Sequence, residues 1–91
     1  MADAISIAGL DVVKHNFARV CAGMEMQLES IDRQIRRLSG MADKDGNIST
    51  LIRSLRRQRN ELQNEISAVK QDIRDLGDLI SAATRELRIS R

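Results

Sequence analysis

Residues 41–51, which read MADKDGNISTL, contain side chains that could bind a cation. Oxygen-bearing side chains occupy alternate positions, as they do at the start of a calcium loop: Asp43, Asp45 and Asn47. Counted from Asp43, the sixth position holds Ile48 where a calcium loop needs glycine, and the last position holds Ser54 where it needs a bidentate glutamate. This spacing argues against calcium, and we predict no metal site.

The same stretch is suited to a turn between two helices. Gly46 can adopt a positive φ without steric cost, and Asn47 or Ser49 can cap the helix that follows. Gly40, where the preceding helical pattern ends, is expected to form a left-handed cap. We therefore predict a turn over residues 40–47.

The other reactive side chains lack the neighbours that catalysis needs. His15 has no cysteine or second histidine at ligand spacing, and Cys21 has no base beside it in the sequence. As the single cysteine, Cys21 cannot form a disulfide within the chain, and we expect it to be a small buried side chain in a reducing compartment. With no phosphate-binding glycine loop or paired carboxylates either, we predict no enzymatic activity, no cofactor and no small-molecule substrate.

Basic residues cluster on both sides of the predicted turn: Arg33, Arg36, Arg37, Lys44, Arg53, Arg56, Arg57 and Arg59. Such a tip could bind the phosphates of RNA or DNA. Aspartates lie among these residues, however, and no aromatic side chain is present there to stack on bases. We favour a solvated, salt-bridged surface and keep nucleic-acid or acidic-protein binding as alternatives.

The composition indicates long helices that must position these residues. The 91 residues include no proline and one aromatic residue, Phe17, while 42% of them are hydrophobic. Nothing in the chain forces a helix to stop except glycine and short polar residues. The net charge of +2 is too balanced to indicate a nucleic-acid partner. We predict one all-α domain.

The second half of the chain carries a heptad repeat over residues 48–88. One series at intervals of seven contains Ile52, Arg59, Ile66, Ile73, Ile80 and Leu87. The other series contains Ile48, Leu55, Leu62, Val69, Leu76 and Ala83. Every position except Arg59 is apolar, which is typical of a long coiled-coil helix.

The first half carries a less regular apolar stripe over residues 10–39. Its members are Leu10, Val13, Phe17, Val20, Met24, Leu28, Ile31, Ile35 and Leu38. Steps of three and four residues predict a helix, and two successive steps of four around Met24 predict a local stutter in the supercoil. Residues 1–9 are expected to form a separate N-terminal segment.

A short turn between two long helices predicts an antiparallel hairpin. With the turn centred near Lys44 and Asp45, the numbers of facing residues should add up to about 90. Arg59 would then lie near Ile31, where it could form an ion pair with Glu29 or Asp32 as a register device. The alternative for Arg59 is an anchor for an acidic partner.

One hairpin has a thin core, and helix 48–88 carries Leu51 and Leu79 beside its seam as well. We therefore predict association with further copies, as a four-helix bundle, or with a helical partner protein. The candidate interaction residues on this helix are Ile66, Ile73, Leu76, Leu79, Ile80 and Leu87. Those at the tip are Arg53, Arg56, Arg57 and Arg59.

Two families of small secreted helical hairpins resemble this chain. The segments SIAGLDVV, DKDGNISTLI and IRDLGDLISA resemble the layout of type III secretion needle subunits over most of the chain, although the proline usual in their turn is absent. The length and hairpin plan resemble the ESAT-6-like group, but LSG at residues 38–40 replaces its Trp-x-Gly turn. Either resemblance implies a secreted assembly subunit, and neither supplies a functional residue.

These observations predict a non-enzymatic assembly subunit: a coiled-coil scaffold, an adaptor or a small chaperone-like protein, with a secretion-system component as one form of it. A nucleic-acid-binding hairpin is the alternative. The start of the chain has no basic region followed by a continuous apolar stretch. We therefore expect a cytoplasmic protein, or one exported without a cleaved signal peptide, with no membrane span.

Overall fold

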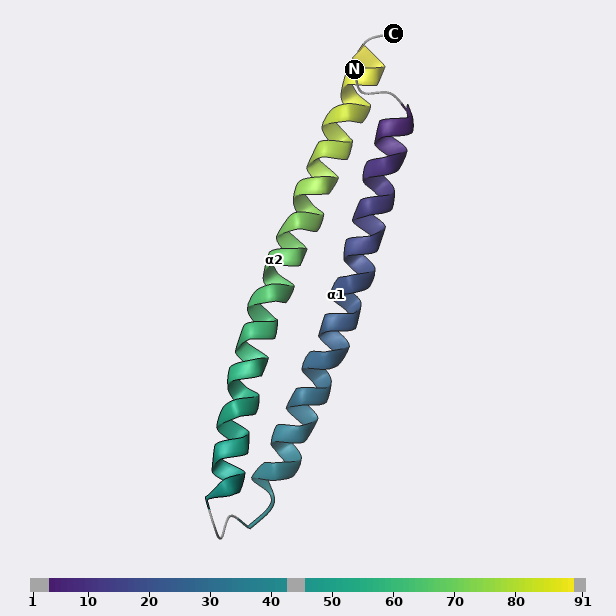
Figure 1. Cartoon of the computed structure of the whole chain (residues 1–91). Helices are drawn as coiled ribbons and strands as arrows, with labels where there is room; N and C mark the ends of the chain where they lie inside the picture. Colours follow the sequence, from purple (N-terminus) through teal and green to yellow (C-terminus); the bar gives the residue numbers. More distant parts are fainter. Residues whose placement is uncertain (1–3, 43–45, 90–91) are drawn as a thin grey trace. The chain divides into compact units, whose positions relative to one another are not determined.

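The structure, a computed structural model, describes residues 4–42 and 46–89, and they fold as an all-α helical hairpin (Figure 1). Helix α1 spans Ala4–Ser39 and helix α2 spans Asn47–Ile89. No strand forms among the described residues. The predicted all-α hairpin is therefore confirmed, and its association into a four-helix bundle stays a prediction.

Helix α1 begins earlier than the sequence predicted. Its first described residue is Ala4, so the prediction of a separate segment is wrong for residues 4–9. These residues contain no proline, and Gly9 in a helix interior costs only about 1 kcal/mol relative to alanine. That cost is too small to stop a helix that continues to Ser39, about eight turns further on.

The end of α1 differs from the predicted left-handed cap. Gly40 does not have a positive φ; among the described residues only Gly46 does, at 74°. The N–H of Gly40 donates to the carbonyl of Arg37 (3.3 Å), and the N–H of Met41 donates to that of Leu38 (3.0 Å). These tight turns satisfy two of the carbonyls that a helix end leaves open, so a left-handed glycine is not needed at residue 40.

Before α2, the backbone behaves as predicted at Gly46. Its positive φ lies in the region that glycine adopts without strain. Its carbonyl accepts hydrogen bonds from the N–H (3.2 Å) and from the hydroxyl (3.1 Å) of Thr50. Asp43, Lys44 and Asp45, on which the calcium question depended, lie outside the described residues.

The described chain divides into two compact units, each built from antiparallel segments of both helices. Unit 1 contains the described residues up to Cys21 and those from Ala68 onward. Unit 2 is Ala22–Ser67 and contains the turn. The prediction of one domain stays a prediction.

Both units have thin cores. Among the described residues only Cys21, Ile35 and Ile66 are buried, and no large side chain is fully buried. Cys21 is buried as predicted, and the reducing compartment stays a prediction. A pair of helices shields each apolar stripe on one side only, so most seam residues remain half-buried.

Candidate protein interface

The seam of α2 follows the predicted heptad. Its positions at intervals of seven, Ile52 to Leu87 and Ile48 to Ala83, are all buried or half-buried. Ile66 is the most protected of them, with 5% of its surface exposed. The periodicity of the sequence therefore identified which face of α2 packs on α1.

The seam of α1 differs from the predicted stripe. The residues that turn toward α2 also recur at intervals of seven, and they are listed by series: Ile7, Lys14, Cys21, Leu28 and Ile35, then Leu10, Phe17, Met24, Ile31 and Leu38. All of them are buried or half-buried except Phe17, which is 36% exposed. The series is unbroken, so the predicted stutter at Met24 is wrong.

Two valines of the predicted stripe lie outside this seam. Val13 is 40% exposed and Val20 is 55% exposed, while Lys14 is half-buried and Cys21 is buried. The local apolar pattern favoured the valines because lysine is rarely placed in a seam. The seam instead keeps one regular interval of seven along the whole helix, and every position of it except Lys14 is apolar.

The predicted pairing register is confirmed in each unit. In unit 2, Nη1 of Arg59 donates to Oδ1 of Asp32 over 3.3 Å. In unit 1, the amine of Lys14 lies 3.7 Å from the point where a Cβ atom at Gly77 would lie. Both pairs of numbers add up to about 90, as the antiparallel hairpin predicted.

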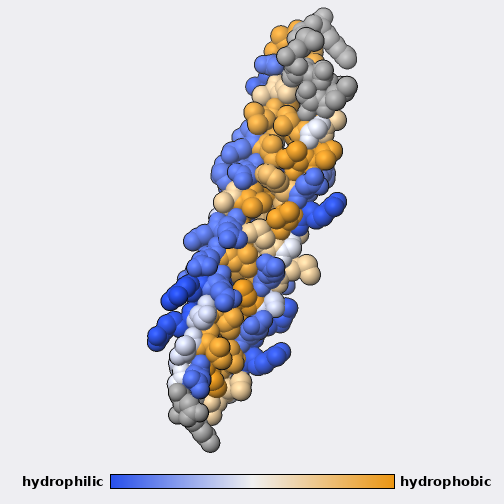
Figure 2. Space-filling model, in the orientation of Figure 1, coloured by the Kyte–Doolittle hydropathy of each residue, from blue (hydrophilic) through white to orange (hydrophobic). Residues whose placement is uncertain are grey.

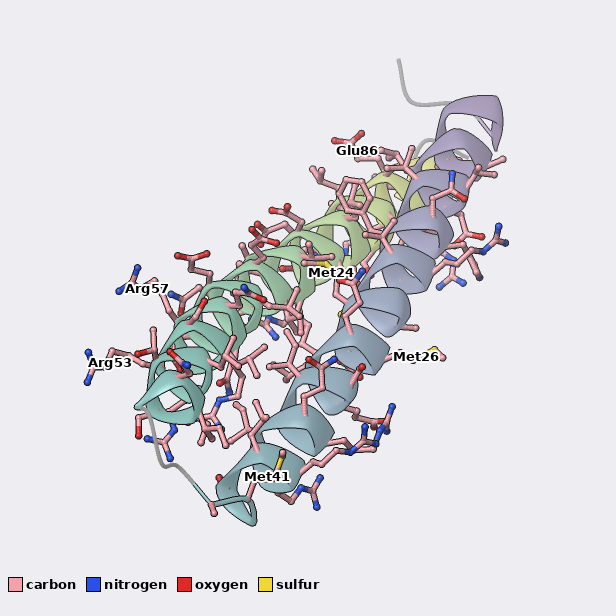
Figure 3. The ribbon with its side chains drawn as sticks, turned by 60° about the horizontal axis from the view of Figure 1, so that its bottom comes forward. Met24, Met26, Met41, Arg53, Arg57 and Glu86 are labelled. Atoms are coloured by element: carbon pink, nitrogen blue, oxygen red, sulfur yellow. The ribbon has the colours of Figure 1, made fainter. Side chains whose placement is uncertain are left out.

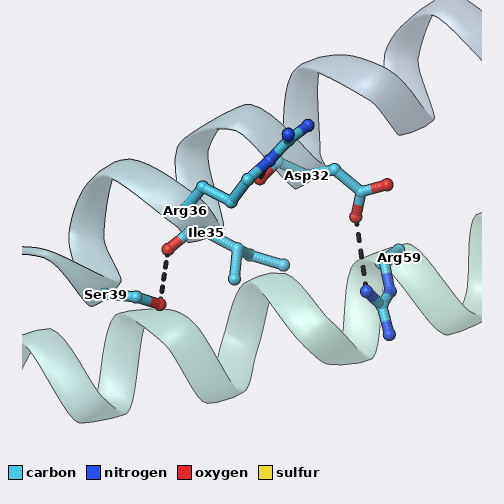
Figure 4. A network of polar contacts seen from close by, with 5 residues as sticks. All are labelled: Asp32, Ile35, Arg36, Ser39 and Arg59. Carbon is cyan, nitrogen blue, oxygen red and sulfur yellow. Dashed lines mark hydrogen bonds and ion pairs between the residues drawn. The ribbon is translucent and has the colours of Figure 1, made fainter.

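Arg59 thus forms one of the two ion pairs proposed for it, the one with Asp32; its alternative role as an anchor for an acidic partner stays a prediction. Its side chain crosses the seam to Asp32, as Figure 4 shows, and Nε of Arg36 lies 3.4 Å from the carbonyl oxygen of Asp32. In the same region, the Ser39 hydroxyl donates to the Ile35 carbonyl. Nε of Arg59 is buried without a hydrogen-bond partner, so the arginine is held in the seam at an energetic cost.

An exposed apolar flank runs along one side of the unit 1 seam. We define this valine flank as Val13 and Val20 of α1 with Leu79 of α2. Val13 and Val20 directly precede the seam residues Lys14 and Cys21, and Leu79, which is 55% exposed, directly precedes Ile80. In an antiparallel pair of helices, the residues that directly precede this series of seam residues on either helix lie on the same side of the pair. In the upper half of Figure 2, hydrophobic side chains form a broad band over the two helices of unit 1.

The opposite side of the unit 1 seam is more polar. Asp11, Lys70 and Thr84 occupy the equivalent positions there, together with the small residues Ala18 and Gly77. The Lys14 side chain turns toward Gly77 on that side. The two sides of the seam are therefore chemically different, and only the valine flank presents a row of apolar side chains.

The predicted interaction residues of α2 fall into different environments. Ile66 is buried, and the half-buried members are Ile73, Leu76, Ile80 and Leu87. Leu79 alone among these six is exposed. The contribution of α1 was not predicted, because Val13 and Val20 were assigned to the seam; intervals of seven counted from Ile7 place both valines outside it.

The four predicted tip arginines also lie in different environments. Arg53, Arg56 and Arg57 are exposed, and Figure 3 shows Arg53 and Arg57 projecting away from the helices of unit 2. Arg53 and Arg56 line a shallow hollow with Ser49 and Ile52. Arg59 is occupied by its ion pair with Asp32. The structure therefore presents three of the four arginines to solvent.

His15 makes a local polar contact with Asp11 on α1. Nδ1 of His15 lies 2.8 Å from the carbonyl oxygen of Asp11 and 3.4 Å from its Oδ2, and both side chains are exposed. This is a local contact one helical turn apart. Within residues 4–42 and 46–89, no three His, Cys, Asp or Glu side chains come together in a way that could hold a metal ion.

Over the described residues, neither helix contains an apolar stretch long enough to cross a membrane. Comparison of the chain with protein-family models, with curated proteins and with solved structures gave no match. The resemblance to secretion subunits therefore stays an expectation from the sequence segments alone.

Proposed function

We propose that this protein is a non-enzymatic assembly subunit that associates through its helices, either with further copies or with a helical partner protein. The observation that carries the proposal is the apolar surface left uncovered. Val13, Val20 and Leu79 in unit 1 and Leu51 in unit 2 are large hydrophobic side chains in solvent. Extended apolar surface of this kind marks interaction sites on soluble proteins.

The total exposed area supports the same proposal. The chain of 10.2 kDa exposes 7075 Å², whereas a compact protein of that mass exposes about 5,300 Å². The excess of about 1,800 Å² exceeds the roughly 800 Å² that each partner buries in a standard protein interface. Only three of the described residues are buried, and covering this surface would supply stability that so thin a core lacks.

Light scattering on the purified full chain tests the proposal. We expect an oligomer at micromolar concentration, with two hairpins completing a four-helix bundle as the simplest form. A folded monomer with cooperative unfolding at the same concentration would contradict association with copies. Capture of one defined helical protein, lost on Leu51→Glu or Leu79→Glu substitution, would then support the partner form of the proposal.

A secretion-system role is one setting for such a subunit, supported by the sequence segments that resemble needle subunits. Its test is the position of the gene beside genes for an export apparatus. The protein being retained in cells with an intact apparatus would count against it.

The second candidate function is nucleic-acid binding by the tip. It is favoured by the exposure of Arg53, Arg56 and Arg57 within one helical turn and a half of α2. Cationic side chains so placed can contact neighbouring phosphates. The matched-charge experiment in the Discussion separates this function from assembly.

A further inference from the structure

Ser39, the last residue of α1, follows two arginines. Arg36 and Arg37 precede it by three and two residues, and Gly40 follows it, so residues 36–40 read RRLSG. No other serine or threonine of the chain has basic residues at both of these distances. Both arginines are exposed. Basic residues in a last turn also complement the helix dipole, but that effect does not depend on a serine placed after them.

This spacing matches what a basophilic protein kinase binds. Such kinases hold an extended substrate segment in a groove whose acidic side chains pair with arginines at a short, fixed distance before the acceptor hydroxyl. Arginine suits such a groove because its planar guanidinium can bind a carboxylate through two hydrogen bonds. Residues 36–39 thus contain both the acceptor and the groups that would select it.

Ser39 lies where a kinase can reach it. The residue is exposed, and α1 ends there, so residues 40–42 already lie outside the helix. Only the last turn of α1 would have to unwind for this segment to enter a groove. Helix ends open at a much lower free energy than helix centres do. Within residues 36–39, Leu38 alone is half-buried, so little packing is lost when this turn opens.

The Ser39 hydroxyl donates a hydrogen bond within α1. Its acceptor is the carbonyl of Ile35, 2.7 Å away, as Figure 4 shows. Phosphorylation would remove the proton of this bond and add about 1.5 to 2 negative charges at the negative end of the helix dipole. The modified side chain could not stay against that carbonyl. Ile35 is one of the few buried residues, so the turn that would be disturbed adjoins the core of unit 2.

We propose that Ser39 is the acceptor site of a basophilic protein kinase and that its phosphorylation opens the last turn of α1. The hydroxyl oxygen attacks the γ-phosphorus of a nucleoside triphosphate, and its proton passes to a carboxylate of the kinase. A bond forms between the serine oxygen and phosphorus. The bond from phosphorus to the bridging oxygen breaks, and a nucleoside diphosphate leaves. This inference does not depend on the proposed assembly function.

The first test is phosphorylation of the purified full chain with ATP and a cyclic-AMP-dependent protein kinase, which is basophilic. We expect mass spectrometry to find a single phosphate, on Ser39, and none on Ser39→Ala. Arg36→Ala/Arg37→Ala should lower kcat/KM at least about 100-fold, since two charge-assisted contacts to the kinase are lost. Alanine and arginine are both strong helix formers, so this substitution should not weaken α1 itself.

The matched control is Arg74→Ala/Arg85→Ala, which removes the same charge from exposed positions of α2. Its kcat/KM should lie within about twofold of the parent value. Phosphate on another residue, or equal slowing in both double variants, would overturn the assignment of the site. The absence of a phosphorylated Ser39 peptide from protein isolated from its host with phosphatase inhibitors would overturn its use in the cell.

Amide hydrogen exchange tests the effect on α1. We expect residues 36–39 of the phosphorylated protein to exchange at least about tenfold faster than those of the unmodified protein, while unit 1 exchanges as before. Ser39→Ala also lacks the hydroxyl but adds no charge, so its exchange should stay closer to that of the parent. Unchanged exchange, or an acceleration no greater than in Ser39→Ala, would overturn the effect proposed for the phosphate.

Discussion

Oδ1 of Asp32 lies 3.3 Å from Nη1 of Arg59, although 27 residues separate the two along the chain. Each belongs to a different helix of unit 2, so the ion pair fixes how α1 and α2 are aligned there. A polar residue in an apolar seam typically specifies register at a cost in stability. The pair therefore leads to a prediction about stability.

Replacing Arg59 with leucine should raise the free energy of unfolding by about 1 kcal/mol, because an apolar side chain fills the seam and the partnerless Nε is removed. Asp32→Ala alone should change it by less than about 1 kcal/mol, since both side chains of the pair are over one-third exposed. Chemical denaturation followed by circular dichroism measures both. A loss of stability in Arg59→Leu would show that the ion pair is a net stabilising contact.

Ile66→Ala should lower the free energy of unfolding by about 2–4 kcal/mol, because it deletes a side chain that is only 5% exposed and leaves a cavity. Leu51→Ala is the matched control in the same unit. Leu51 is 52% exposed beside the seam, so its loss should be below about 1 kcal/mol. Denaturant titration at one protein concentration compares the two. Equal losses would contradict the assignment of the α2 seam.

Lys14→Ile should raise the free energy of unfolding by about 1 kcal/mol, because Lys14 occupies a half-buried seam position where an apolar side chain gains burial. His15→Ile makes a comparable change at the next, exposed residue and should have an effect within about 0.5 kcal/mol of zero. The midpoint temperatures of thermal unfolding show which of the two variants is more stable. If His15→Ile were the more stable variant, the α1 seam would be misassigned.

Removing the three exposed tip arginines as Arg53→Ala/Arg56→Ala/Arg57→Ala tests nucleic-acid binding. If the tip binds phosphates, binding of a fluorescent single-stranded RNA at about 50 mM salt should weaken at least tenfold and lose part of its salt dependence.

The matched control removes the same charge from the exposed unit 1 part of α2, as Arg74→Ala/Arg85→Ala/Arg88→Ala. It should bind RNA as the parent does. Equal weakening in both triple variants would indicate a diffuse charge effect, and no binding by the parent at this salt concentration would exclude the function.

The sequence predicted α2 well because its heptad is both regular and apolar. The seam positions from Ile48 to Leu87 are protected as the pattern indicated, and the pairing of Arg59 with Asp32 followed from the length of the turn. The start of α1 was predicted less well. Residues 4–9 contain one glycine and no proline, so the sequence has no clear signal for where the helix begins.

The candidate interface was missed because the apolar residues of α1 were followed step by step and not at intervals of seven. Around residues 13–21, two apolar rows compete: Val13 with Val20, and Lys14 with Cys21. Local hydrophobicity favours the valines, but the seam uses the second row. Which row faces α2 depends on the apolar series over the whole helix, and a step-by-step reading of neighbouring residues does not contain that information.

The exposed position of Val13 and Val20 means that α1 is locally frustrated. In natural sequences the residue that suits a position locally usually also suits the whole fold. Here the apolar valines lie in solvent, whereas the amine of Lys14, a seam residue, lies near Gly77. A rotation of α1 by about 100° would exchange the rows. Part of the hydrophobic content of α1 therefore does not stabilise the hairpin. A sequence selected only for the stability of a lone hairpin would place these side chains in the seam.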